Sequence, residues 1–272
     1  QVAYVWIDAL FNYLTGPLAS IGFDFKNKSF EEIEEALKDF WPAEIHLIGK
    51  DILRFHAVIW PALLLALNLP LPRLLFAHGF FTVEGEKISK TKGNVVDPLK
   101  LKQKFGLSAL RYYLFREFPF GEDGDFSEKN LILRYNTELA DNIGNLFSRS
   151  LNLMQKYNWK PPQVNPRHDT IEKHLEELRF KEALEEINRL AQEANRLIDQ
   201  EKPWELIKEA KQAQEFALKN QAQEKLEKIF GEIYQTLSVI AYYLSDFLPE
   251  AGEKMENALK NLHPQIIFPK IQ

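Results

Sequence analysis

The sequence predicts an α/β first half followed by an all-α second half. Up to about residue 120, short runs rich in β-branched and aromatic residues alternate with helical stretches, an order typical of a mainly parallel sheet covered by helices. From Ser127 onward, glycine and β-branched residues become sparse, and long stretches of Leu, Ala, Glu, Lys and Gln carry apolar residues at helical spacing. We therefore expect one domain over residues 1–124 and a second over residues 125–272.

In the first half, strands are expected at residues 2–7, 44–48 and 74–78. The stretch from Asp51 to Leu67 predicts a helix that Asp51 caps and Pro61 kinks, because proline removes a helix hydrogen bond.

In the second half, helices are expected near residues 127–157, 170–200, 203–221 and 223–247. Pro203 suits a first helical turn, and the Pro-rich stretch 160–166 separates the first two helices. The C-terminal tail, with Pro264 and Pro269, is expected to lie extended on the surface.

Composition excludes several classes of protein. The 34 basic and 39 acidic side chains give a net charge of −5, which argues against a basic nucleic-acid coat protein. The absence of Cys excludes a disulfide framework, a thiol nucleophile and a thiolate zinc site, and it suits a reducing cytoplasm. The most apolar stretch, Ala57–Leu67, has eleven residues, fewer than the roughly 18 that span a bilayer, so no membrane association is expected. The chain begins with Gln1 and enters a strand-like run at once, which suggests a piece of a longer protein.

The densest positive charge lies between Lys87 and Lys104, where six lysines face the single acid Asp97. Its central sequence, GEKISKTKGNVVDP, predicts a glycine-bracketed loop that offers ammonium and hydroxyl groups to an anion. An exposed hairpin with solvated lysines would show the same pattern.

Two sets of side chains in the first half each share one apolar face that also includes aromatic or imidazole rings with a polar atom. Ile52, His56 and Trp60 are spaced i, i+4 and i+8 and so share one helix face. Near the chain start, Trp6, Ala9, Leu10 and Tyr13 fall on one side of a strand-to-helix transition. Either set could line a pocket or simply pack a core.

In the helical half, Asn145 and Arg149 stand at i and i+4, and Trp204 follows Pro203 at a helix start. Exposed aromatic, amide and guanidinium groups are what recognition of unpaired RNA bases requires. The alternative is a buried Trp with a surface Asn–Arg pair.

These motifs together resemble those of the methionyl-tRNA synthetases, a family of class I aminoacyl-tRNA synthetases. KISKT followed by KGN is similar to the KMSKS loop, with Ile88 in place of Met and Thr91 in place of the final Ser. The resemblance implies that Lys87, Ser89, Lys90 and Thr91 form the catalytic loop, and that Lys90 stabilises charge on the departing pyrophosphate.

The resemblance also assigns binding residues. It implies that the adenylate lies near Gly49, Lys50, Asp51, His78 and Gly79. It implies that the methionine side chain is bound by Trp6, Ala9, Leu10, Tyr13, Ile52, His56 and Trp60, and that Asn145, Arg149 and Trp204 read the CAU anticodon.

By this resemblance the chain would hold the second half of a Rossmann-type catalytic fold and an anticodon-binding helix bundle. ATP with Mg²⁺, L-methionine and tRNA(Met) would be its substrates and partners, and no metal ligand is assigned. No His-x-Gly-His motif occurs and the family's zinc knuckle is absent, so we expect activity to need an N-terminal half, in the same chain or as a separate subunit. The alternatives are a synthetase for leucine, isoleucine or valine, and a non-catalytic RNA-binding or scaffold protein.

Overall fold

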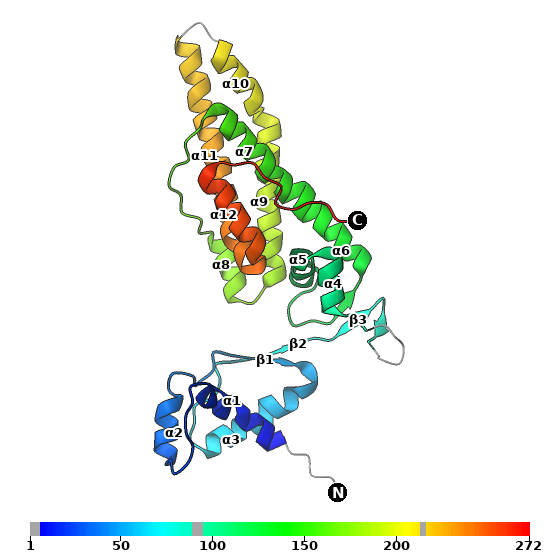
Figure 1. Ribbon diagram of the computed structural model, residues 1–272, viewed down its shortest axis with the longest axis vertical. Helices are drawn as coiled ribbons and strands as arrows, with labels where there is room; N and C mark the ends of the chain where they lie inside the picture. Colours follow the sequence, from blue (N-terminus) through cyan, green and yellow to red (C-terminus); the bar gives the residue numbers. More distant parts are fainter. Residues whose placement is uncertain (1–5, 89–94, 213–215) are drawn as a thin grey trace. The chain divides into compact units, whose positions relative to one another are not determined.

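The computed structural model describes residues 6–88, 95–212 and 216–272, which pack as two compact units (Figure 1). Unit 1 comprises Gln1–Phe80 with Gly121–Asp123, and unit 2 comprises Phe81–Phe120 with Gly124–Gln272. This division follows packing, whereas the boundary at residue 124 rests on composition and stays a prediction.

In its described part, residues 6–80 and 121–123, unit 1 contains a two-stranded parallel sheet and three α-helices. Strand β1 (Ile45–Gly49) pairs with β2 (Leu74–His78), so that Ile45 lies opposite Leu74 and Gly49 opposite His78. The predicted strands at 44–48 and 74–78 are confirmed to within one residue. The helices are α1 (Trp6–Ser20), α2 (Phe30–Leu37) and α3 (Trp60–Ala66).

The strand predicted at residues 2–7 is wrong at Trp6 and Ile7, which begin α1; residues 2–5 lie outside the described residues. The reason is the helical spacing of Leu10, Leu14 and Leu18, all of which are buried in the core of unit 1. Burial of this face determines the local structure in spite of the β-branched and aromatic residues before it.

The helix predicted over 51–67 forms in three sections: η1 (Lys50–Ile52, 3₁₀), η2 (Phe55–Ile59, π) and α3. Its first turn begins after Gly49, so Asp51 lies inside that turn and does not cap it, contrary to prediction. Pro61 stands in the first turn of α3, where its missing N–H is tolerated, and the N–H of Trp60 reaches back to Phe55 O across the wider π turn.

Unit 2 begins with a small mixed sheet in the order β4-β3-β5. Strand β3 (Phe81–Val83) pairs antiparallel with β4 (Glu86–Lys87) and parallel with β5 (Gly124–Phe126). Between them come α4 (Pro98–Phe105), which Asp97 caps, and α5 (Leu107–Glu117).

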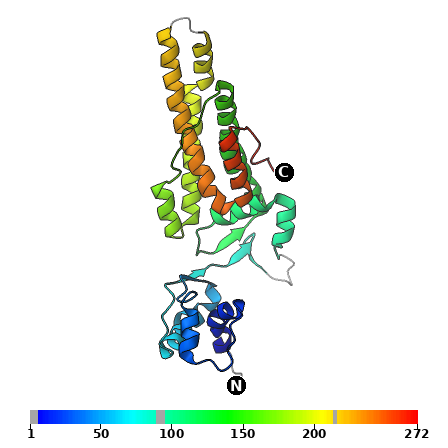
Figure 2. The same ribbon diagram turned by 60° about the vertical axis from the view of Figure 1, so that its left-hand side comes forward.

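The rest of unit 2 is a helix bundle, in which the long helices run side by side in both views (Figures 1 and 2). The helix predicted over 127–157 is confirmed as one run: α6 (Glu128–Arg134), the π-helical η3 (Tyr135–Gly144) and α7 (Asn145–Tyr157). The bundle continues with five more helices in the described residues: α8 (Asp169–Glu176), α9 (Phe180–Glu201), α10 (Pro203–Gln212), α11 (Phe216–Phe247) and α12 (Pro249–Asn261).

Four details of the bundle differ from the prediction. Leu178, with φ of 58°, divides the expected helix 170–200 into α8 and α9. The expected break near residue 222 lies inside α11, and α12 was not predicted. The C-terminal tail is extended, but Ile267 and Phe268 are buried, because their side chains enter the bundle core.

Candidate functional site

The first group of predicted site residues gathers at the carboxyl ends of β1 and β2. Gly49 ends β1 opposite His78, and Lys50 and Asp51 follow in η1. A Cβ atom on Gly49 would lie 2.6 Å from Asp51 Oδ1 and 3.9 Å from His78 Cε1. In open parallel sheets, ligands bind outside this edge of the strands.

Lys50 is held by groups that the sequence did not point to. Its ammonium lies 2.5 and 2.6 Å from the two carboxylate oxygens of Asp123 and 4.5 Å from the centre of the Phe80 ring. Asp123 Oδ1 also accepts the N–H of Phe80 at 2.7 Å. The hydrogen bond from Lys50 and then that from Phe80 lower the pKa of Asp123, so this carboxylate is ionised.

Gly79 makes this arrangement possible. A Cβ atom there would lie 2.2 Å from Glu122 O, so only glycine lets residues 121–123 approach the end of β2. His78 is exposed, and its Nδ1 lies 3.0 Å from Gly79 O. The five residues predicted for the adenylate therefore do lie together, and Asp123 joins them.

An aromatic cluster forms in unit 1 around Tyr13. Its hydroxyl lies 2.8 Å from His56 Nε2, and its ring is 5.9 Å from the Trp60 ring. His56 and Trp60 are both buried, whereas Tyr13 is 37% exposed and so stands where the cluster meets the surface. The helix face inferred from the spacing of His56 and Trp60 is thus real, and α1 adds Tyr13 to it.

The hydrogen bonds assign the tautomer of the neutral His56 ring. Its Nδ1 lies 3.0 Å from Ile52 O, and a carbonyl can only accept, so Nδ1 carries the proton. In the neutral ring, Nε2 therefore accepts the hydroxyl proton of Tyr13, whose oxygen keeps its lone pairs for another donor. Burial raises the pKa of Tyr13, so its hydroxyl stays protonated at neutral pH.

His46 also belongs to this cluster, although the sequence reading missed it. Its ring stands edge-on to Tyr13 at 4.4 Å, and it is 5% exposed. Burial and the nearby His56 lower the pKa of His46. The sequence feature that could have identified His46 is the strand IHLIG, in which alternation places His46 and Ile48 on the buried face.

Two polar atoms of this cluster are unsatisfied: among the described residues, His46 Nε2 and Trp60 Nε1 are buried without a hydrogen-bond partner. Buried polar groups in proteins nearly always have a partner, so these two nitrogens remain open to a further polar group.

The other residues predicted for the amino acid differ in exposure. Leu10 is 1% exposed within the core, Ile52 is half-buried and Ala9 is exposed. Trp6 begins α1.

The lysine loop lies mostly outside the described residues. Lys87 ends β4 opposite Thr82, and Ser89, Lys90 and Thr91 fall in the stretch 89–94 that the structure does not describe. Next to it, Ile88 is 37% exposed and lines an apolar cavity of about 210 Å³ with residues of α4 and α5. The side chain of Ile88 therefore contributes to an apolar contact of unit 2.

In unit 2, two of the three predicted RNA-contacting residues are exposed on helices, and the third, Arg149, is paired with a carboxylate. Asn145 is exposed at the start of α7, and Trp204, 42% exposed, lies in the first turn of α10. Arg149 donates a 2.7 Å hydrogen bond from Nη2 to Asp199 Oδ1 on α9. Helices α7 and α10 pack against each other.

Within residues 6–88, 95–212 and 216–272, no group of three or more His, Asp or Glu side chains is arranged to hold a metal ion. Over the same residues, no helix is both long and apolar enough to cross a membrane.

The chain carries a parallel-sheet edge with polar groups at the carboxyl ends of its strands, and a separate helical bundle that exposes Asn145 and Trp204. A sequence model of the family described as tRNA synthetases class I (M) matches residues 1–151, more than half of the 272-residue chain. The chain belongs to this family.

Individual relatives support the same family assignment. The chain is 40% identical over 271 residues to the methionine--tRNA ligase of Caldanaerobacter subterraneus subsp. tengcongensis, covering 94% of this chain and 39% of that protein. It is 38% identical to the enzyme of the same name from Bacillus subtilis, again over 94% of this chain and 38% of that protein. The chain thus spans about two fifths of the length of these curated relatives.

Among solved structures, Mycobacterium tuberculosis methionyl-tRNA synthetase in complex with methionyl-adenylate matches with a TM-score of 0.75 at 32% identity. The match covers 98% of this chain and 56% of that one. The free form of the same enzyme matches with a TM-score of 0.77.

Proposed function

We propose that the chain is part of a methionine--tRNA ligase. Residues 1–124 would form the second half of its Rossmann-type catalytic fold, and residues 125–272 its anticodon-binding domain. The observation that carries the proposal is the cluster of Tyr13, His56 and Trp60 beside the sheet edge that holds Lys50 and His78, in a chain of this family. Such an enzyme acts in the cytoplasm, where its tRNA is.

The proposed reaction has two steps. The carboxylate oxygen of L-methionine attacks the α-phosphorus of ATP, the bond to the bridging oxygen breaks, and pyrophosphate leaves with the electron pair, giving methionyl adenylate. A hydroxyl of the terminal ribose of tRNA(Met) then attacks the methionyl carbonyl and releases AMP. Mg²⁺, which accompanies ATP, would shield the phosphate charge.

Tyr13, Ile52, His56 and Trp60 would bind the methionine side chain, together with Trp6, Ala9 and Leu10. Apolar rings suit a flexible, polarizable thioether. The unsatisfied nitrogens of His46 and Trp60 support a ligand with a polar atom in this cluster. A branched aliphatic amino acid has no such atom in its side chain, which favours methionine over leucine, isoleucine or valine.

On the nucleotide side, Gly49, Lys50, Asp51, His78 and Gly79 would surround the adenylate. Lys50 is already paired with Asp123, so a phosphate that binds Lys50 must share the ammonium with that carboxylate or displace it. Lys87, Ser89, Lys90 and Thr91 would hold the triphosphate, with Lys90 stabilising the charge that develops on pyrophosphate.

The missing part of the catalytic fold would be an N-terminal half that carries the HIGH motif. One face of the two-stranded sheet supports this inference, because Ile45, Leu47 and Leu74 are 45%, 57% and 42% exposed. Parallel sheets are normally covered on both faces, so apolar strand residues at this exposure indicate that more chain packs here.

Methionine-dependent exchange of pyrophosphate into ATP tests the proposal. The full-length ligase that contains this segment should catalyse the exchange with methionine and not with leucine, isoleucine or valine. The chain alone should be inactive or nearly so. In the full-length enzyme, Lys90→Ala should lower the exchange rate by about 10²–10³-fold, because it removes one charge-stabilising donor, and leave tRNA affinity unchanged.

Lys100→Ala is the matched control, since Lys100 is an exposed lysine of the same basic stretch, on α4. A wild-type exchange rate for the isolated chain would show that no N-terminal half is needed. Full activity of the Lys90→Ala enzyme would favour the non-catalytic alternative.

A further inference from the structure

The C-terminal tail forms one wall of a hollow beside Asn145. The hollow measures about 430 Å³ and is lined by the end of η3, the first turn of α7 and the tail: Ala140, Asp141, Gly144, Asn145, Ser148, Ile266, Ile267 and Phe268. Its size falls within the ~300–1,000 Å³ typical of small-ligand sites, enough for one base and its sugar.

The wall is held in place by specific contacts. The side chain of Asn136 donates to Ile271 O at 2.9 Å and accepts the N–H of Ile271 at 3.0 Å. Phe268 is 4% exposed and packs against Gly144, where a Cβ atom would lie 3.1 Å from Leu139 O and 3.6 Å from the Phe268 side chain. The tail is therefore a fixed part of the surface.

One side chain of the tail does not contribute to this packing. Ile266 lines the hollow and is 77% exposed, whereas the next two residues of the tail, Ile267 and Phe268, are each 4% exposed. An isoleucine at this exposure adds nothing to the core, so its apolar surface is available to a ligand.

The polar groups at the hollow suit an RNA base. Asn145 offers an exposed amide and Ser148 a hydroxyl, the kinds of group that read the edges of unpaired bases. The nearby carboxylates are paired: Asp141 with Lys270 at 2.9 Å and Asp199 with Arg149 at 2.7 Å. Both cations are partly exposed and can also meet a phosphate.

We propose that this hollow takes one unpaired base of the anticodon loop, with Ile266 against its face and Asn145 and Ser148 at its edge. The inference rests on the proposed function and deepens it, because it adds the C-terminal tail to the RNA-binding surface.

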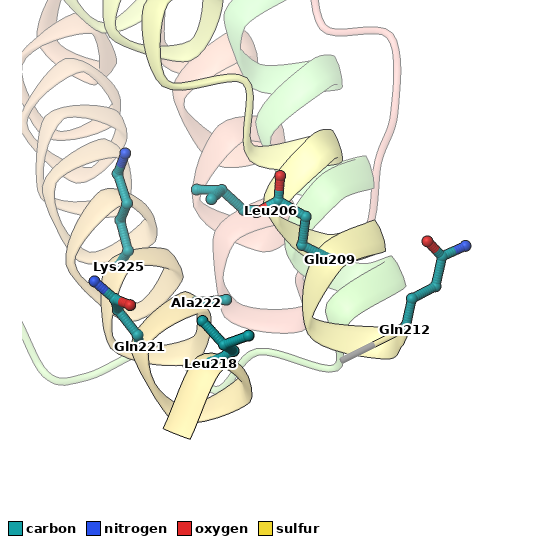
Figure 3. Close-up of a pocket in the computed structure, with 7 residues that line it drawn as sticks. All are labelled: Leu206, Glu209, Gln212, Leu218, Gln221, Ala222 and Lys225. Carbon is teal, nitrogen blue, oxygen red and sulfur yellow. The ribbon is translucent and has the colours of Figure 1, made fainter. Parts of the chain in front are cut away.

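A second groove, of about 560 Å³, lies between α10 and α11, lined by Leu206, Glu209, Gln212, Leu218, Gln221, Ala222 and Lys225 (Figure 3). It supplies the matched control. Leu218 is an aliphatic side chain of the same unit that is 55% exposed in a hollow, and it stands on α11, away from the tail in sequence.

The experiment measures binding of the chain to an RNA hairpin with the anticodon stem and loop of tRNA(Met), and to hairpins that each lack the base at one loop position. Ile266→Ala should weaken binding of the complete hairpin roughly five- to tenfold, because it removes apolar surface buried against the base. Ile266→Val should restore most of the affinity, and Leu218→Ala should bind like wild type.

The loss caused by Ile266→Ala should disappear for the hairpin that lacks one particular base, which identifies the base in the hollow. If Ile266→Ala binds every hairpin like wild type while a changed anticodon still weakens binding, the inference is overturned and the proposed function stands. If the wild-type chain does not distinguish the hairpin from one with a changed anticodon, both the anticodon assignment and this inference fail.

Discussion

At the scale of single residues, the direction of one hydrogen bond determines what the aromatic cluster can bind. Because Ile52 O requires the proton on His56 Nδ1, the hydroxyl of Tyr13 donates to His56 Nε2. A ligand thioether must therefore accept from another donor or displace this bond. The indole N–H of Trp60, buried without a partner among the described residues, is one such donor in the cluster.

His46 should make unit 1 sensitive to acid. Its pKa in the folded protein is lowered, so below about pH 6.5, the ordinary value for histidine, the unfolded chain takes up a proton that the folded chain resists. Stability is therefore complete above that pH and is lost as the pH falls toward the folded pKa. The groups that face His46 are Tyr13, His56 and Trp41, and of these Trp41 reports unfolding by fluorescence.

Thermal unfolding of the chain followed by tryptophan fluorescence between pH 7.5 and 5.5 checks this prediction. The wild-type melting temperature should fall over this range, and His46→Leu should flatten the fall. His263→Leu, at an exposed histidine in unit 2, should leave the pH dependence unchanged. An equal fall of the melting temperature in the wild type and both variants would mean that His46 does not cause the pH dependence.

Residue spacing could predict which side chains share a face, but not which of them meet another element. The set Ile52, His56 and Trp60 follows from i, i+4 spacing alone. Asp123 could not be found this way, since it lies 73 residues from Lys50 in the chain, and its approach depends on the missing side chain of Gly79.

At the scale of elements, a partly buried ion network centred on Glu138 joins α5, α6, η3 and α9. Arg116 binds Glu138 through two nitrogens, at 2.9 and 3.1 Å, and Glu185 through a third at 2.9 Å. The hydroxyl of Tyr112 donates to the same Glu138 at 2.6 Å. Burial, and then the charge of Glu138, raise the pKa of Tyr112 well above its usual value, so it serves as a donor at any physiological pH.

Arg116→Met should destabilise unit 2 by roughly 1–3 kcal/mol, because it takes the two nitrogens of Arg116 from the largely buried Glu138 and leaves Arg134, at 2.7 Å, as its remaining cation. Arg179→Met is the matched control: Arg179 pairs with Glu177 and Glu182 at 3.4 and 3.3 Å on the surface, where each of these side chains is at least 31% exposed, and its loss should cost less than about 1 kcal/mol. Urea unfolding monitored by circular dichroism measures both. Equal stability of the two variants would show that the network contributes no more than a surface pair.

Helix boundaries were predictable where proline or a capping residue marks them, as at Ser127, Pro203 and the 160–166 break. The division at Leu178 was not, because a leucine with positive φ carries no signal in the sequence; the turn is closed by backbone hydrogen bonds from Leu178 N to Leu175 O and from Arg179 N to His174 O. The π turns of η2 and η3 also leave no mark on the apolar periodicity that defines a helix.

At the scale of the whole molecule, the order of an α/β part before a helical part was readable from composition, since β-branched runs and long Leu- and Glu-rich stretches need no tertiary information. The packing division at Phe80 was not readable, because strands β3 to β5 belong with the helical unit through contacts between distant segments. The exposed apolar face of β1 and β2 could be recognised only in the structure, where the two strands pair.

The central claim is that the helical half of this family member reads an anticodon. It is tested most directly by the affinity of the chain for tRNA(Met) and for the same tRNA with its CAU triplet changed, at two salt concentrations that separate phosphate attraction from base recognition.

The account predicts that the altered tRNA binds much more weakly at both salt concentrations, and that Trp204→Ala removes the difference, since base stacking on an exposed aromatic ring is worth about 1–3 kcal/mol. Equal binding of the two tRNAs by the wild-type chain would contradict it, and would leave Asn145, Arg149 and Trp204 as ordinary surface residues of a helix bundle.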